Sequence, residues 1–204
     1  MEKIIYLENI QAEAPDGNIL IRMGHKKGIT KMSPQDKARI GDEIKKARML
    51  CRPQGAYLKL KIAANKSGSL ELENGAVFKS SKLCALLEKS GEAVLMASTA
   101  GKEPVEARDR EIAAGNGATA LIIDATASET ADAGLDWIQE FLNSQIAKHG
   151  RKLTARYSPG YGDLDLSAQK TIFDALKLET IGISITARFI LVPEKTVLAI
   201  AGII

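Results

Sequence analysis

The sequence predicts an α+β fold: a single domain, residues 1–204, in which a mixed or antiparallel twisted sheet is flanked by helices. Three observations support this class. An alternating segment at 57–62 turns through Ser67-Gly68 into a second short strand, which predicts an antiparallel pair. A continuously apolar segment at 93–97 indicates a strand buried on both faces, as in a sheet covered by helices. No repeat or flexible linker divides the chain, although its pattern changes near residue 90.

The composition is that of a globular protein with a substantial core, since 45% of the residues are hydrophobic and 26% are charged. The net charge of +3 is too small and dispersed to predict nucleic-acid binding. Cys51 and Cys84 have neither zinc-site nor disulfide-framework spacing, which favours buried thiols in a reducing compartment. Because residues 1–3 do not begin a signal peptide and no apolar run is long enough to span a membrane, we expect a soluble cytoplasmic protein.

The first half of the chain is predicted to alternate strands with helices. Ser33-Pro34 is a strong helix start, because Ser is a favoured N-cap and Pro is favoured at the first helical position. The apolar stripe that follows runs to Cys51, which we therefore expect in the core. His25 lies in a predicted loop, where a lone histidine is usually neither ligand nor base. The predicted elements are strands at 4–7 and 18–22, a loop at 24–28, a helix at 34–51, strands at 57–62 and 70–72, and a helix at 82–89.

The second half contains longer apolar runs. A second continuously apolar run, at 118–124, predicts another buried strand with Asp124 at its carboxyl end. Asp124 has two interpretations, a ligand-binding group or, more commonly, a cap of the following turn. The other predicted elements are a strand at 93–97, helices at 104–114, 128–149 and 167–178, and a β-hairpin formed by 181–192 and 196–204 within the sheet.

No catalytic or metal-binding motif is recognisable. Residues 115–120 match the letters G-x-G-x-x-A, but a dinucleotide-binding motif follows a strand and opens a helix. Here the predicted order is helix and then strand, so we interpret the glycines as a helix stop. Walker, G-x-S-x-G and HExxH motifs are missing from the sequence, and nothing in the spacing of Ser, His and Asp supports a triad. We therefore predict no catalytic side chain and no metal ligands.

The stretch at 152–163 combines a short strand with an unusual turn. Gly160 and Gly162 permit positive φ or close approach of a ligand, and Pro159 fixes the turn before them. Arg156 and Tyr161 flank it. A guanidinium can bind a carboxylate through two bonds, and a tyrosine offers a ring face and a hydroxyl. The alternative is a structural strand–turn–helix corner with a surface arginine, which pattern alone favours slightly.

The run Arg156-Tyr157-Ser158-Pro159-Gly160-Tyr161 fits the pattern R-x-x-P-G-Y. It resembles the S-adenosylmethionine-binding motif of the reactivation (activation) domain of vitamin B12-dependent methionine synthase. Its extension to Asp163 is similar to free-standing versions of that domain, which occur as separate chains. Weaker similarity covers most of the sequence, at 22–25, 98–101, 120–124 and 186–193. The resemblance implies a fold like that of the methionine synthase activation domain.

The resemblance implies a reactivation subunit for a separate cobalamin-carrying methionine synthase in methionine biosynthesis. In that family, an electron donor such as flavodoxin or ferredoxin reduces inactive cob(II)alamin, and S-adenosylmethionine remethylates the cobalt. The cobalamin belongs to the partner protein. Such a chain is a component of the methyltransferase and not a complete enzyme by itself.

The resemblance also implies the residues of the site. Arg156 is expected to hold the methionine carboxylate, the main chain around Ser158 and Gly160 to bond the adenosine part, and Tyr161 to pack near the sulfonium. Asp136 falls at the position of a family carboxylate that lies near the ligand amine. Its place on the helix, opposite Ile138, makes it either a solvated acid or a group that faces a cleft.

Two departures from the family bear on this expectation. Thr186-Ala187-Arg188 stands where the family has Thr-Glu-Ser, and the sequence ends before the tyrosine that closes the ligand site in fused enzymes. Both favour a weaker or incomplete site. The alternatives are a non-catalytic interaction or scaffold module for a corrinoid protein, and a reactivator of another corrinoid methyltransferase.

Overall fold

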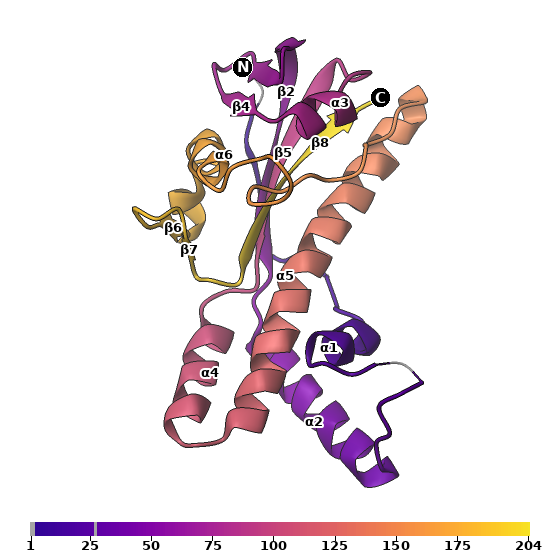
Figure 1. Ribbon diagram of the computed structural model, residues 1–204, viewed down its shortest axis with the longest axis vertical. Coiled ribbons are helices and arrows are strands. Elements are labelled where there is room, and N and C mark those ends of the chain that lie inside the picture. Colours follow the sequence, from indigo (N-terminus) through magenta and orange to yellow (C-terminus); the bar gives the residue numbers. More distant parts are fainter. Residues whose placement is uncertain (1–2, 27) are drawn as a thin grey trace.

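The protein is described by a computed structural model covering residues 3–26 and 28–204; Lys27, in the predicted loop at 24–28, lies outside the described residues. An antiparallel sheet runs through the middle of the molecule in the order β4-β3-β2-β5-β8, and β1 pairs with β2 (Figure 1). The strands of this sheet are β1 (Ile5–Leu7), β2 (Gln54–Lys66), β3 (Ser69–Leu72), β4 (Val77–Lys79), β5 (Glu92–Thr99) and β8 (Thr196–Ile203). A separate small sheet pairs β6 (Ser184–Ile185) with β7 (Leu191–Val192).

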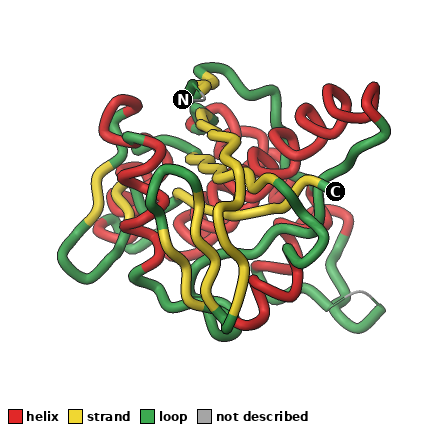
Figure 2. The backbone as a smooth tube through the Cα atoms, turned by 90° about the horizontal axis from the view of Figure 1, so that it is seen from above, coloured by secondary structure: helices red, strands yellow, loops and turns green. Residues whose placement is uncertain are grey.

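The central strand β5 pairs with β2 on one side and with β8 on the other, both antiparallel. Val94 and Met96 point to one face of the sheet and Leu95 and Ala97 to the other, and all four are fully buried. Helices therefore cover both faces, which confirms the expectation drawn from the continuously apolar sequence of this strand (Figure 2).

The long helix α5 (Gly117–Ile146) covers one face, and α6 (Ala168–Leu176) lies against the other (Figure 1). Gly134 allows α5 to approach β5 closely, because a Cβ added there would collide with the Ser98 hydroxyl. The remaining helices are α1 (Asp16–Arg22), α2 (Pro34–Leu50), α3 (Ser81–Leu86), α4 (Glu103–Ala113) and the short 3-10 helices η1 (Ala147–His149) and η2 (Leu178–Ile181). None of the helices in the described part of the chain is long and apolar enough to cross a membrane.

The prediction of a strand at 118–124 was wrong, because these residues form the first turns of α5. A short, wholly apolar run has no period that separates a buried strand from a buried helix. Here Ile122 packs against Ile19 and Ile44, and Ile123 packs against α2 and α4, so the run is surrounded by helices. The residues before it still end a helix, since Gly115 has a φ of +79° just after α4.

Two further predictions were wrong. Residues 18–22 lie in α1 and not in a strand; Pro15 is the N-cap of this helix, and Asp16 lies in its first turn. The segments 181–192 and 196–204 do not form one hairpin: β8 pairs with β5, and β6 pairs with β7. The apolar C-terminal segment does lie inside the sheet, as expected. The short strand β4 has no clear sequence signal.

The helix predicted at 128–149 is present, but its predicted start at Ser128 was wrong, because α5 begins at Gly117. The remaining predicted elements are confirmed within a few residues. Ser33 caps α2, since its hydroxyl accepts a bond from the Asp36 N–H at 3.0 Å. Cys51 is buried directly after that helix, whereas Cys84 is half-buried. The segment at 152–157 runs beside β8 through isolated bridges, with Leu153 opposite Ile203.

Candidate functional site

The turn that follows Arg156 is fixed by backbone bonds on its first side. Tyr157 and Ile200 exchange two main-chain bonds, of 2.8 and 2.9 Å, so the segment enters the turn as an extra edge strand beside β8. Within the turn, the Gly160 N–H donates to the Leu164 carbonyl at 2.8 Å. Gly160 has a φ of +86°, which a residue with a side chain rarely adopts. The glycine there is thus required by the turn itself.

Arg156 and Asp136 face each other across the gap between this segment and α5. Nη2 of Arg156 lies 2.6 Å from Oδ1 of Asp136. The Arg156 side chain is 23% exposed and the Asp136 side chain 64%, so the pair opens to solvent on its acidic side. Nη1 of Arg156 is buried and has no hydrogen-bond partner among the described residues. A buried guanidinium nitrogen without an acceptor is suited to a ligand carboxylate.

A row of acids on α5 continues from this pair toward α1. Glu129, Asp132 and Asp136 recur at helical spacing and share one side of the helix. Arg22 of α1 binds two of them, with Nε 2.5 Å from Glu129 and Nη2 3.1 Å from Asp132. Burial raises the pKa of Asp132, which the nearby arginines only partly oppose. We name Arg22, Glu129, Asp132, Asp136 and Arg156 the α5 charged face.

Tyr161 projects from the turn with 71% of its surface exposed. Arg22 lies within electrostatic range of Tyr161. Burial opposes the charged form of the Arg22 guanidinium, but the bond to Glu129 and the nearby Asp132 and Tyr161 outweigh this effect. The pKa of Arg22 is therefore raised. The Tyr161 ring offers a largely free surface on the turn. Ser158 begins the turn, and its carbonyl accepts the Tyr161 N–H at 3.3 Å.

The structure thus brings the five predicted site residues into one region, formed by the turn and α5. Sequence reasoning missed Arg22 and Asp132. Arg22 stood in a segment expected to be a strand, which hid its place on a helix next to α5. Asp132 had a usable signal, since it lies four residues before Asp136 on the same helix.

Asp124 does not cap a turn, because α5 continues on both sides of it. It lies within α5, where its carboxylate is 2.9 Å from Arg108 Nη1 and 2.7 Å from Lys195 Nζ. Burial opposes its ionised form, but the bonds from Lys195 and Arg108 prevail, and its pKa is lowered. Arg108 also binds Glu194, so the group ties α4 and α5 to the turn before β8.

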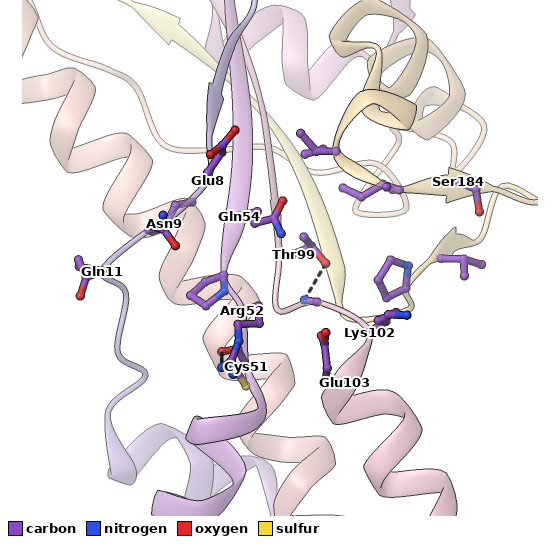
Figure 3. A pocket seen from close by; sticks show the side chains of 18 residues that line it. Glu8, Asn9, Gln11, Cys51, Arg52, Gln54, Thr99, Lys102, Glu103 and Ser184 are labelled. Carbon is purple, nitrogen blue, oxygen red and sulfur yellow. Dashed lines mark hydrogen bonds between the residues drawn. The ribbon is translucent and has the colours of Figure 1, made fainter.

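A cavity of about 690 Å³ lies elsewhere, where β1, β2 and β5 approach α4 and the small sheet (Figure 3). Figure 3 shows Glu8, Gln54, Thr99 and Glu103 around it, and none of the five predicted residues lines it. Its arginine, Arg52, donates to the carbonyl oxygens of Met49 and Cys51 at 2.8 and 3.0 Å. Among the residues that the structure describes, no group of His, Cys, Asp and Glu side chains is arranged to hold a metal ion.

Comparison with known proteins gives one informative result. Neither a family model nor a curated protein matches the sequence. Among solved structures, the chain is similar to the MetH reactivation domain bound to AdoHcy, with a TM-score of 0.75 and 14% sequence identity. The similarity covers 98% of this chain and 78% of that chain. The chain therefore has the α+β fold of the MetH reactivation domain, as its sequence predicted.

Proposed function

We propose that this chain binds S-adenosylmethionine between the 157–163 turn and the α5 charged face, and that it serves as a reactivation subunit for a separate cobalamin-dependent methionine synthase. The observation that carries the proposal is the opposed pair of Arg156 and Asp136 on a fold like that of a domain solved with AdoHcy. AdoHcy is S-adenosylmethionine without its transferable methyl group, so the two present the same amino-acid and adenosine groups to a protein.

The charges of the site match the amino-acid end of this ligand. Its carboxylate would bind the Arg156 guanidinium, whose Nη1 is buried without a partner among the described residues. Its ammonium would lie by Asp136, only 2.6 Å from the same guanidinium. A zwitterion presents both charges on one carbon, so it can replace the Arg156–Asp136 bond with two bonds of the same kind.

The turn supplies the remaining contacts. The Gly160 N–H is already bonded to Leu164 and is not free to bind a ligand. The carbonyl oxygens of the turn would therefore be the groups that accept a bond from the adenine amino group. The exposed Tyr161 ring offers a face to the sulfonium or the base. These residues bind and orient the ligand. No side chain here needs to act as acid or base, because the reaction is a direct methyl transfer whose main requirement is alignment.

S-adenosylmethionine supplies the methyl group, and the cobalamin and its reductant, such as flavodoxin or ferredoxin, belong to partner proteins. The contribution of this chain would be to present the ligand methyl group at an open surface that a partner can cover. The exposure of Tyr161 and Asp136 fits such a surface. We place the protein in the cytoplasm, where such a partner would work.

Calorimetric titration of the purified chain with S-adenosylmethionine and with AdoHcy tests the proposal. Arg156→Ala should weaken binding at least tenfold and leave the free energy of unfolding within about 1 kcal/mol of the wild type. Arg151→Ala is the matched control, since Arg151 lies directly before the same segment but pairs with Glu92 at 2.5 Å. Unchanged affinity in the Arg156 variant would contradict the proposed site.

Titration in the presence of a cobalamin-binding domain separates the remaining alternatives. Binding only in its presence would mean that the partner completes the site, as the departure at Ala187 suggests. Absence of binding under both conditions would favour the scaffold role for a corrinoid protein. Binding with no effect on methionine synthase would favour another corrinoid methyltransferase as the partner.

A further inference from the structure

Asp163 ends the turn that carries Ser158, Gly160 and Tyr161, and its carboxylate receives bonds from two other parts of the chain. The Ser80 hydroxyl and the Tyr157 hydroxyl both donate to Oδ1, the latter at 3.3 Å. The Lys82 N–H, in the first turn of α3, donates to Oδ2 at 3.2 Å. Tyr157 precedes the turn and Ser80 lies 83 residues away in sequence. The carboxylate therefore joins both ends of the turn to α3.

The groups that hold Asp163 are themselves fixed. Ser80 is 4% exposed, and its hydroxyl also accepts the Leu83 N–H at 3.0 Å as the N-cap of α3. Leu83 is fully buried and anchors that helix in the core. The bond from Ser80, together with the backbone N–H groups of α3, lowers the pKa of Asp163, so the carboxylate stays ionised at neutral pH.

Gly162 makes this arrangement possible. Its φ is +58°, and a Cβ added there would collide with the Tyr157 hydroxyl. The Tyr157 hydroxyl thus lies close against the backbone of Gly162 where it bonds to Asp163. Tyr161, by contrast, is held by few neighbours, since most of its surface is exposed. Its position depends on the backbone being fixed at 157 and at 163.

We infer that Asp163 is a positioning residue, which holds the 158–162 turn in its binding conformation by joining Tyr157 and Ser80, without touching the ligand. The expected effect of Asp163 on the affinity for S-adenosylmethionine rests on the proposed function. Its effect on the turn is independent of any ligand. A turn held at both ends loses less conformational freedom on binding than a free one, and this difference should be measurable as affinity.

The experiment compares Asp163→Ala with Asp165→Ala in the full chain. Asp165 is a matched control, because its exposed carboxylate also accepts a bond from a backbone N–H, that of Ser167 at 2.8 Å. Asp165 lies after the 158–162 turn and its bond does not join the turn to α3. Hydrogen exchange of the Gly160, Tyr161 and Leu164 amides is measured without ligand, and S-adenosylmethionine affinity is measured by calorimetry. Asp163→Ala should speed exchange of these amides about tenfold and weaken binding about tenfold, with β5 amides unchanged.

Tyr157→Phe separates positioning from a general loss of structure. It keeps the ring and removes only the hydroxyl donor to Asp163, so it should weaken binding in the wild type but not further in Asp163→Ala. Faster exchange in Asp163→Ala with unchanged affinity would overturn the positioning role. Exchange in Asp163→Ala that is no faster than in Asp165→Ala would also overturn the positioning role, whether or not the chain binds S-adenosylmethionine. Failure of the wild-type chain to bind S-adenosylmethionine would count against the proposed function alone.

Discussion

The two parts of α5 pack against different neighbours. Its first part, 117–131, lies among helices: Ile122 contacts residues of α1 and α2, and Ile123 contacts α2 and α4. Its second part, 132–146, lies on the sheet, where Ile138 packs with residues of β5 and β8. Only the second part carries the predicted site residue Asp136. The comparison shows that one continuous helix joins a helical region to the sheet. The proposed site lies on the outer side of its second part, where Asp136 is exposed.

The largest expected effect is a difference in the free energy of unfolding lost at a residue packed on the sheet and at one packed among helices. Ile138 is fully buried against the sheet, whereas Ile123 is 7% exposed among helices. Replacement by alanine should lower the free energy of unfolding by about 4 kcal/mol at Ile138 and about 2 kcal/mol at Ile123, since a cavity in the sheet contact cannot collapse easily. Urea denaturation measures both. Equal losses would mean that the two parts of α5 contribute alike.

The next effect concerns the outer side of the second part. Asp136→Asn removes the charge that we expect to bind the ligand ammonium and should weaken S-adenosylmethionine binding about tenfold. Glu140→Gln is the control, because Glu140 is an exposed acid one turn further along the same helix. Isothermal titration compares the two. A similar loss in both variants would indicate a general effect of helix charge.

The first part of α5 should lose stability at acid pH, through Asp124. Bonding lowers the pKa values of Asp124 and Glu194, mainly through Lys195 and Arg108 for Asp124 and through Arg108 for Glu194. Their contribution is therefore fully present above the unfolded carboxyl pKa, about 4, and is lost as the pH falls through the lower folded values. Partial exposure limits it to about 1 kcal/mol.

Arg108→Met tests this expectation. The stability difference from the wild type should be about 1 kcal/mol at pH 7 and should shrink below pH 4. Lys170→Met is the control, because Lys170 forms an exposed pair with Asp174 at 2.5 Å on α6. Thermal unfolding between pH 3 and 7 provides the measurement. A constant difference across this range would show that Arg108 acts through packing alone.

The smallest effect concerns the thiols. Cys51 is buried beside Ala127 and Ala131 of the first part of α5, and burial raises its pKa. Cys51→Ala should cost about 1 kcal/mol and Cys84→Ala less, since Cys84 is only half-buried. Neither should change ligand affinity. Loss of S-adenosylmethionine binding with normal stability in either variant would contradict their assignment to the core.

The pattern near residue 90 does not mark a division in the sheet. β5 begins after that point and pairs along its length with β2, which lies before it. We therefore infer one folding unit, to be tested by a single cooperative unfolding transition seen by both fluorescence and circular dichroism.

The sequence by itself determined the elements whose signals are local. The Ser33 cap and Pro34 fixed the start of α2, alternation at 57–62 marked β2, and the glycine-rich turn after Arg156 was visible as a distinct feature. These signals depend on neighbours within one or two turns of the chain, so they can be read without knowing what packs against them.

Only the tertiary structure decided which segments meet. The run at 118–124 is apolar apart from Thr119 and the terminal Asp124, and it is a helix surrounded by helices, while β8 pairs with β5 instead of with the segment before it. The bond between Arg156 and Asp136 joins residues 20 apart, and that between Ser80 and Asp163 joins residues 83 apart. A periodic pattern shows which side of an element is buried but not which partner buries it, so the pairing on which the proposed site rests depends on the tertiary contact between α5 and the turn.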